Sequence, residues 1–501
     1  MTSHPLILSI DQGTTSSRAL VFDDLGRIVS VSQQEYTQYF PEPGWVEHDP
    51  EEIWSATLST ARAAILEAEQ KTGGSVVTIG ITNQRETTVA WDRQTGRAVS
   101  RAIVWQDRRT SAYCAELRKA GREDEIAERT GLTIDPYFSA TKLRRILQNA
   151  EEAASLAETG QLAFGTIDSF LIYRLTGGQH HLTDETNASR TMLYNIKTGT
   201  WDDRLLDLFD IPSSVLPEIK PSTTSFGETS EEIFGRPIQI CGVAGDQQAA
   251  AFGQTCWQPG MVKSTYGTGC FLLASSGSTI IRSRSGLLST VACRTGADRQ
   301  FAVEGSIFIA GAVSQWLRDE LQVIESAKDT EAMSASVDGN GGVYMVPAFT
   351  GLGAPHWESD ARGTIFGLTR DSNRATVVRA AIESVAYQTH DLLDSLRTDG
   401  LAVGEIRVDG GMVANSWFIQ FLADILDIRI CRPEIIESTA RGAAFLAGLA
   451  SGVFSNTDQL ESLWRSEREF QPNMTEDERA HLLRGWDNAV KATRFHARLS
   501  S

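Results

Sequence analysis

The sequence predicts an α/β protein of two domains, each built on a mixed five-stranded sheet, with the active site in the cleft between them. The chain has 501 residues, more than one typical hydrophobic core accommodates. A strand, a turn of Gly and Thr and a second strand occur at residues 7–22, and the same pattern recurs from residue 263. We therefore expect two related domains, at residues 1–253 and 254–501.

The first domain begins with a predicted three-stranded meander over residues 7–32. A helix follows near residue 50, where Asp49 is a favourable N-cap, Pro50 suits the first helical position and Glu52 is expected to bond back to the cap. An apolar strand at residues 76–81 comes next. This order of elements is the opening order of the actin-like, ribonuclease-H-like ATPase fold.

The second half alternates strands and helices in a similar way. A strand at 240–245 ends in Gly-Asp and leads into an Ala-rich helix, and the second hairpin occupies 263–271. A strand at 300–306 precedes a helix, a long amphipathic helix is predicted at 374–396, and a strand at 406–409 ends in two glycines. Glycines at such a strand end let a flat ring or a ribose approach the backbone.

Composition excludes several kinds of partner. The formal charge of −18 argues against a nucleic acid or an anionic membrane surface, which both require clustered Lys and Arg. The six cysteines form no C-x-x-C pair and lie mostly in apolar segments, as expected of free thiols in the cytoplasm. Neither a signal peptide nor an apolar run long enough for a membrane span is apparent, so we expect no membrane insertion.

Polar residues gather at three points where predicted strands or loops end. They are Arg85 with Glu86, the segment from Trp105 to residue 109, and Tyr137 in the segment 135–138. Each alone is better explained by a local salt bridge or by a buried aromatic residue whose polar end is hydrogen-bonded. Three in succession favour a polar pocket with an aromatic wall, because α/β proteins place ligands at strand ends.

The two hairpins suit phosphate oxygens. Asp11 lies where the first strand ends, and the turn at Gly13 offers free backbone N–H groups, although this stretch alone also fits an ordinary hairpin. The P-loop pattern is absent. Phosphoryl transfer needs positioning, charge neutralisation and a base for the attacking hydroxyl. We assign Asp11 to magnesium and Asp246, ahead of the second hairpin, to the base.

The acceptor is expected to be small, polar and uncharged. Arg85 and Glu86 place a donor beside an acceptor, as a vicinal diol requires, while Trp105 and Phe271 are available to cover its carbon face. A charged substrate would require more Lys or Arg in this region. A site that hydrogen-bonds hydroxyl groups strongly rejects analogues lacking them.

Ten motifs carry a resemblance to a known family over residues 7–490: IDQGTTSSR, GWVEHDP, GITNQRETT, IVWQDRRT, DPYFSATK, TNASRTML, GDQQAA, TYGTGCF, PAFTGLGAP and RVDGG. With these the sequence resembles the glycerol kinases of the carbohydrate kinase family, which share the actin-like fold. The resemblance implies ATP-dependent phosphorylation of a terminal hydroxyl of glycerol to sn-glycerol 3-phosphate, with Mg²⁺, and a homo-oligomer.

The resemblance also implies roles for individual residues. The expected glycerol contacts are Arg85, Glu86, Trp105, Tyr137, Asp246, Gln247 and Phe271. The expected nucleotide contacts are Thr14, Thr15, Ser16, Arg18, Thr268, Gly311, Gln315, Gly411 and Asn415. Asp246 is implied as the catalytic base, and the expected metal site comprises Asp11 and Asp246.

This sequence lacks two regulatory motifs that some related kinases carry. The segment 230–236 retains only the final Arg of a fructose 1,6-bisphosphate loop, and Glu232 stands where some relatives carry a phosphorylatable His. We therefore expect neither form of control.

Two alternatives stay open at this point. A related sugar or sugar-alcohol kinase, acting for example on xylulose or xylitol, would share the phosphate hairpins. A non-enzymatic actin-like nucleotide-binding module would share the fold but has no need of the cluster of Arg85, Glu86 and Tyr137.

Overall fold

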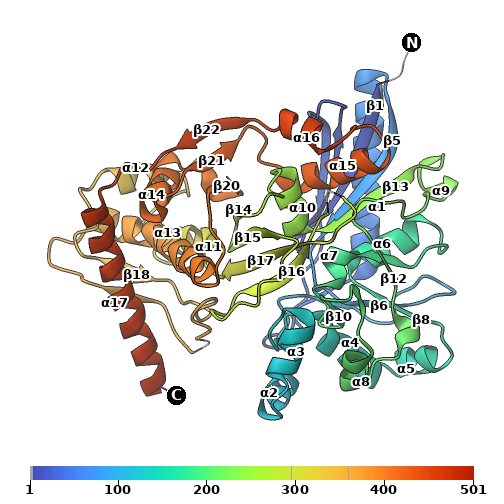
Figure 1. The fold of residues 1–501 in the computed structure, drawn as a ribbon, viewed down its shortest axis with the longest axis horizontal. Coiled ribbons are helices and arrows are strands. Elements are labelled where there is room, and N and C mark those ends of the chain that lie inside the picture. Colours follow the sequence, from blue (N-terminus) through green and yellow to red (C-terminus); the bar gives the residue numbers. More distant parts are fainter. Residues whose placement is uncertain (1–3, 295, 359, 501) are drawn as a thin grey trace.

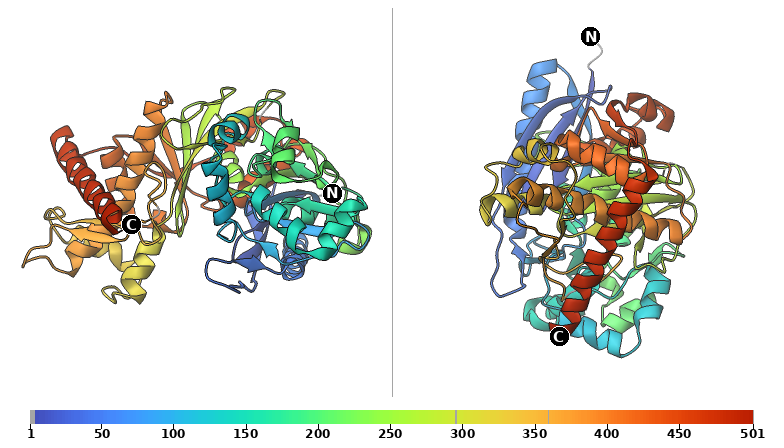
Figure 2. Two further views of the ribbon diagram at one scale, coloured as in Figure 1. Left: turned by 90° about the horizontal axis from the view of Figure 1, so that it is seen from below. Right: turned by 90° about the vertical axis from the view of Figure 1, so that its left-hand side faces the viewer.

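The protein consists of two α/β halves side by side (Figure 1). This computed structural model describes residues 4–294, 296–358 and 360–500. The view from below shows the same division, with the long C-terminal helix at the outer edge of the second half (Figure 2, left). No helix of the described ranges is long and apolar enough to cross a membrane.

The first half is built on a mixed five-stranded sheet, as the sequence predicts. In spatial order its strands are β13 (Gln239–Gly245), β5 (Ser75–Asn83), β1 (Pro5–Gln12), β2 (Ser16–Phe22) and β3 (Ile28–Glu35). β1, β2 and β3 form the antiparallel meander, while β5 and β13 extend the sheet in parallel from β1.

The second half repeats this arrangement in a larger sheet. Its seven strands, in spatial order, are β16 (Leu288–Ala292), β17 (Gln300–Ile307), β15 (Cys270–Gly277), β14 (Met261–Tyr266), β20 (Glu405–Asp409), β21 (Ile430–Pro433) and β22 (Ser466–Phe470). β14, β15 and β17 form the meander, and β20 and β21 are the parallel additions. Five strands thus match the first sheet in order and direction.

The expectation of five strands in the second sheet was wrong, because β16 and β22 add one strand at each edge. β22 contains Glu467, Arg468 and Glu469, so it lacks the apolar run by which a strand is recognised. β16 is apolar but short, and it follows a segment rich in Ser, Arg and Gly.

Helices flank both sheets (Figure 1). The helices of the first half are α1 (Pro50–Thr72), α2 (Ser111–Lys119), α3 (Glu123–Thr130), α4 (Ser139–Asn149), α5 (Glu151–Glu158), α6 (Ile167–Leu175), α7 (Glu185–Ala188), α8 (Asp203–Phe209), α9 (Glu231–Phe234) and α10 (Asp246–Gly253). Those of the second half are α11 (Gly311–Asp319), α12 (Asp329–Ala335), α13 (Arg374–Thr398), α14 (Ser416–Leu426), α15 (Ser438–Ala450), α16 (Thr457–Leu463) and α17 (Glu476–Ser500).

The remaining strands form two-stranded pairs. They are β4 (Glu47–His48) with β7 (Ala102–Ile103), β6 (Val89–Asp92) with β8 (Leu162–Gly165), β9 (Leu182–Asp184) with β12 (Glu218–Lys220), β10 (Tyr194–Asn195) with β11 (Thr200–Trp201), and β18 (Tyr344–Val346) with β19 (Thr364–Phe366).

The start of α1 differs in one detail from the sequence prediction. Asp49 caps the helix by accepting from the N–H of Glu51, and Pro50 is the first helical residue. Glu52 does not bond back to the cap; its carboxylate instead accepts from the backbone N–H of Thr37 at 2.9 Å and from the hydroxyl of Tyr39 at 2.6 Å. A tertiary contact has replaced the local one.

Alternate residues of β1 face two separate hydrophobic layers. Leu8 and Ile10 pack in a cluster with residues of α1 and α6, whereas Ile7 packs in a cluster with residues of α15. The approach of α15 is close: a Cβ on Gly442 would lie 1.8 Å from the carbonyl oxygen of Ala249 in α10. Helix α15 comes late in the chain but packs directly on the first half. The domain boundary at residue 253 stays a prediction.

Candidate active site

Asp246 is the first residue of α10, directly after strand β13. Its side chain is 31% exposed, and Arg85 Nε lies 3.2 Å from its Oδ1. The backbone N–H of Gln247 donates to the same oxygen at 2.7 Å. Loss of water around the carboxylate raises the pKa of Asp246, against the opposing effects of Arg85 and Lys263. The result is an accessible carboxylate with increased affinity for a proton.

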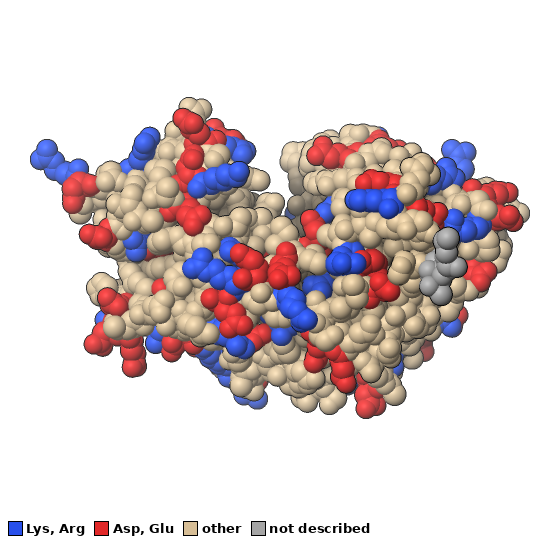
Figure 3. Space-filling view, turned by 90° about the horizontal axis from the view of Figure 1, so that it is seen from above, with Lys and Arg blue, Asp and Glu red and all other residues tan. Residues whose placement is uncertain are grey.

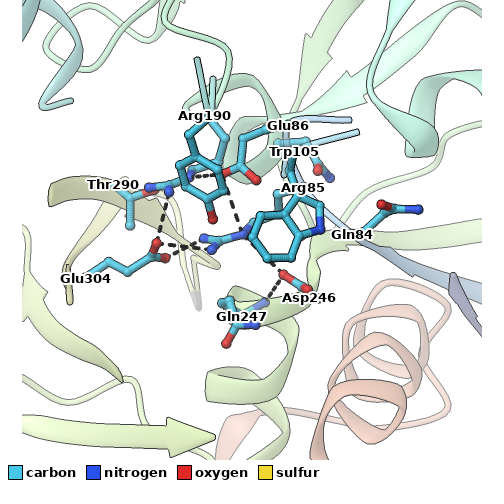
Figure 4. Close-up of polar contacts among 12 residues, drawn as sticks. Gln84, Arg85, Glu86, Trp105, Arg190, Asp246, Gln247, Thr290 and Glu304 are labelled. Carbon is cyan, nitrogen blue, oxygen red and sulfur yellow. Dashed lines mark hydrogen bonds and ion pairs between the residues drawn. The ribbon is translucent and has the colours of Figure 1, made fainter. Parts of the chain in front are cut away.

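Behind Asp246 lies a buried network of four charged side chains: Arg85, Glu86, Arg190 and Glu304 (Figure 4). Glu304 accepts from Arg85 Nη2 at 3.1 Å and from Arg190 Nη2 at 2.9 Å. Arg190 Nε donates to Glu86 Oε1 at 2.6 Å. Two positive and two negative charges balance, which suits a pocket for an uncharged molecule.

The network joins the two halves of the protein. Arg85 and Glu86 follow β5, and Arg190 follows α7, but Glu304 belongs to β17 of the second sheet. Burial raises the pKa of Glu304, yet Arg190 and Arg85 outweigh this effect and the pKa lies below its ordinary value. Burial also raises the pKa of Glu86, and there the two arginines do not outweigh it.

Sequence reasoning gave no role to Arg190 or Glu304. Arg190 lies in the motif TNASRTML, and Glu304 is the one acidic residue of an otherwise uncharged strand, Gln300–Ile307. A carboxylate in such a strand needs a buried partner. The isolated acidic residue was therefore the one feature of the sequence that indicated a buried charge network. The sequence does not reveal which residue is the partner, since Arg190 lies 114 residues from Glu304.

Three aromatic rings lie next to one another in the same region. The Trp105 ring meets Tyr137 edge-to-face with centroids 5.7 Å apart, and Phe271 in the same manner at 6.2 Å. Trp105 Nε1 also donates to Thr14 Oγ1 at 3.0 Å. The structure therefore brings the predicted aromatic residues together and connects them to the first hairpin.

Two further side chains connect α10 to its surroundings. The fully buried Lys263, which sequence reasoning also missed, donates from Nζ to Gln247 Oε1 at 2.5 Å. Gln248 Oε1 accepts from Arg85 Nη1 at 3.2 Å, while its Nε2 donates to Thr290 Oγ1. These bonds fix both Gln247 and Arg85 beside Asp246.

The first hairpin is the turn between β1 and β2, and it carries Thr14, Thr15, Ser16 and Arg18. The N–H of Gly13 donates to the carbonyl of Ser16 at 2.9 Å. Arg18, expected at the nucleotide, lies 3.9 Å from Asp11 Oδ2 and 2.7 Å from Glu437 Oε2.

Asp11 lies at the end of β1, and burial raises its pKa to about 7. The positive charge of Arg18 lowers that pKa, while the negative charges of Asp246 and Glu437 raise it further. A cation beside Asp11 would relieve this repulsion. Mg²⁺ prefers such a site, with one or two carboxylates and the remaining ligands from water and phosphate.

The second hairpin adjoins the start of α11. The N–H of Gly311 donates to the carbonyl of Gly267 at 2.8 Å, and those of Ala310 and Ala312 donate to the carbonyl of Thr268. A Cβ on Gly311 would lie 2.5 Å from the oxygen of Gly267, so only glycine fits. Gln315 is exposed on the same helix.

The turn after β20 lies beside this hairpin. Gly410 has φ of +91°, and a Cβ there would lie 2.5 Å from the carbonyl oxygen of Tyr266. A Cβ on Gly411 would meet only open space. Asn415 caps α14 by accepting from the N–H of Phe418 at 2.8 Å. The expected nucleotide contacts therefore fall into two groups, one on each half.

The space-filling view shows a deep notch between the two lobes (Figure 3). Positive and negative side chains are interspersed on this face, with no extended basic surface. Arg85 with Glu304, and Trp105 with Phe271, make contacts across the junction of the two halves.

Comparison with known families identifies the fold. Residues 6–253 match the N-terminal domain of the FGGY family of carbohydrate kinases, and residues 262–451 match the C-terminal domain of the same family. The chain belongs to the FGGY family of carbohydrate kinases. Its two halves are the two domains that define the family, which confirms the predicted fold class.

Several glycerol kinases resemble this chain over nearly its full length. A glycerol kinase of Rhodospirillum centenum is 55% identical over 497 residues, covering 99% of this chain and 100% of the relative. Glycerol kinase 1 of Pseudomonas aeruginosa is 53% identical over 491 residues, covering 98% and 99%. Among solved structures, Plasmodium falciparum glycerol kinase with ADP superposes with a TM-score of 0.94 at 37% identity, over 98% of each chain.

A sugar kinase also shares the architecture. Xylulose kinase of Lactobacillus acidophilus superposes with a TM-score of 0.87 at 22% identity, covering 97% of each chain. That level of identity shows a common fold and no more.

Proposed function

We propose that this protein transfers the γ-phosphoryl group of ATP to a terminal hydroxyl of glycerol, giving sn-glycerol 3-phosphate. The observation that carries the proposal is the position of Asp246, an accessible carboxylate 3.2 Å from Arg85 and beside a charge-balanced buried network. The glycerol kinases that match nearly the full chain support the choice of acceptor.

Asp246 acts as the base in this mechanism. Its carboxylate accepts the proton of the attacking hydroxyl while that oxygen bonds to the γ-phosphorus, and the bond from phosphorus to the leaving ADP oxygen breaks. The acceptor is held beside Asp246 by Arg85 and Gln247. Glu304 fixes Arg85, and Lys263 fixes Gln247. The rings of Trp105, Tyr137 and Phe271 cover the carbon face of glycerol.

The two hairpins hold the nucleotide. Thr14, Thr15, Ser16 and Arg18 approach the phosphates from the first half, and Thr268 does so from the second. The adenosine binds to the second half, at Gly311, Gln315, Gly411 and Asn415. Asp11, with Asp246 nearby, would hold Mg²⁺, which supplies positive charge to the phosphate oxygens. Approach of the two domains would exclude water, which competes as an acceptor.

Two further expectations accompany this proposal, one implied by the family resemblance and one by the free cysteines. We expect the enzyme to be a homo-oligomer and to work in the cytoplasm. Size-exclusion chromatography with light scattering tests the first, and cell fractionation tests the second.

A panel of acceptors tests the function. ADP release is measured with glycerol, dihydroxyacetone, xylitol and xylulose at equal concentrations, with Mg-ATP present throughout. We expect the highest kcat/KM with glycerol. A preference for xylulose or xylitol would instead favour a sugar or sugar-alcohol kinase, and nucleotide-dependent assembly without acceptor-stimulated ADP release would favour a non-enzymatic module.

A further inference from the structure

Lys142 of α4 is a fully buried ammonium group close to the proposed glycerol site. Its Nζ donates to three backbone carbonyls, those of Glu86 at 3.3 Å, Phe138 at 3.3 Å and Tyr137. Among the described residues, no carboxylate forms a salt bridge with it. Lys142 therefore uses its charge on backbone oxygens alone.

The backbone of Glu86 requires such support. Its φ is +58°, in the left-handed region that residues with a side chain rarely occupy. Its carbonyl accepts from Ser139 Oγ at 3.0 Å and from Thr88 Oγ1 at 3.1 Å, in addition to Lys142. Three donors therefore hold one strained carbonyl, and two of them belong to the segment DPYFSATK.

The same ammonium holds the segment that carries Tyr137. Glu86 and Tyr137 are 51 residues apart in the sequence but both bond to Lys142 through their carbonyls. Glu86 and Tyr137 are two of the proposed glycerol contacts. One side chain therefore sets the distance between two walls of the pocket.

Stability alone does not explain a charge at this position. Burial lowers the pKa of Lys142 to about 8, although the charges of Glu86, Asp107, Asp135 and Cys114 oppose the change. Burying a charge costs free energy unless the charge is paired or hydrogen-bonded, and backbone carbonyls alone compensate it here. The ammonium group of Lys142 is instead explained by the two backbone segments that it holds, those of Glu86 and Tyr137.

We propose that Lys142 and Ser139 are positioning residues for glycerol binding, holding the strained backbone of Glu86 and the segment of Tyr137 at the spacing that the acceptor requires. This inference rests on the proposed function. Neither residue contacts the reacting atoms in this account, so their effect should appear mainly in the KM for glycerol.

The test compares Lys142→Met and Ser139→Ala with the wild-type enzyme and with Lys119→Met, the same substitution at an exposed lysine of α2. Steady-state kinetics gives kcat and the KM for glycerol and for ATP, and circular dichroism with thermal melting reports folding. We expect each site variant to raise the KM for glycerol, by about tenfold to a hundredfold for Lys142→Met. The KM for ATP and the kcat should stay within about threefold of wild type, and Lys119→Met should change nothing.

Each outcome decides between the possibilities. An unchanged KM for glycerol in both site variants, or equal rises in the KM for glycerol and for ATP, would overturn the positioning role. If Lys142→Met does not fold, Ser139→Ala decides alone, because it removes a single hydroxyl from the same carbonyl. Failure of the wild-type enzyme to phosphorylate glycerol would instead refute the proposed function.

Discussion

Replacing Glu304 by Gln tests the buried network most severely. The substitution keeps the shape of the side chain but removes one of two negative charges that face Arg85 and Arg190. Glu304 is 2% exposed, so water cannot replace the lost charge. Breaking a buried ion pair destabilises a protein by about 3–5 kcal/mol. Since the amide retains one acceptor oxygen, we expect a loss of about 3 kcal/mol in the free energy of unfolding.

Thermal melting and kinetics measure the two consequences. A loss of about 3 kcal/mol lowers the Tm of a domain of this size by about 6–12 °C. Arg85 also loses its anchor beside Asp246, so kcat/KM for glycerol should fall about a hundredfold. That fall corresponds to a loss of about 2.7 kcal/mol of transition-state stabilisation.

Glu405→Gln is the matched control. Glu405 lies in the same sheet and also bonds to two arginines, Arg407 and Arg429, but Arg429 is 43% exposed. Solvent screens that pair, so the control should lose less than about 1 kcal/mol and retain full glycerol affinity. A Glu304→Gln enzyme with the Tm and kcat/KM of the control would refute the reasoning.

Three further predictions concern the base, the pocket and the metal. Thr186 Oγ1 accepts from the N–H of Gly245, the residue before Asp246, at 2.9 Å. Thr186→Val should therefore lower kcat about tenfold or more, with an unchanged KM for ATP; equal kcat would contradict it. Lys142 has a pKa of about 8 and is charged below that pH, so the KM for glycerol should rise as the pH increases through 8, and a flat profile would contradict this. Asp11→Asn should raise the Mg²⁺ concentration for half-maximal turnover by about 10–100-fold, whereas an unchanged Mg²⁺ titration would remove Asp11 from the metal site.

The elements with strong local signals were predictable from the sequence. Asp49 and Pro50 mark the start of α1, Asn415 caps α14, and the two Gly-Thr hairpins indicate the repeated fold. Each signal depends on neighbours in the chain, so no knowledge of distant residues is needed. The strands at the edges of the second sheet were less visible, because the charged β22 gives no apolar run.

The site could be predicted in part for the same reason. Arg85, Glu86 and Asp246 stand at strand ends, where local sequence indicates a ligand site. The side chains that hold the site in place are distant in the sequence. Arg190, which bonds to Glu86, is 104 residues away from it. Lys263, which bonds to Gln247, comes from β14 of the other sheet. Glu52 shows the same limit, since a residue placed for a capping box instead bonds to Thr37 and Tyr39.

The assignment of Asp246 as the base is the central claim, and Asp246→Asn tests it most directly. The amide keeps an oxygen for Arg85 but cannot accept the proton of the acceptor hydroxyl. We predict that kcat with glycerol falls by about 10²–10⁴ while the Kd for Mg-ATP, measured by calorimetry, stays within about threefold of wild type. Turnover within tenfold of wild type, with ATP binding intact, would contradict the account.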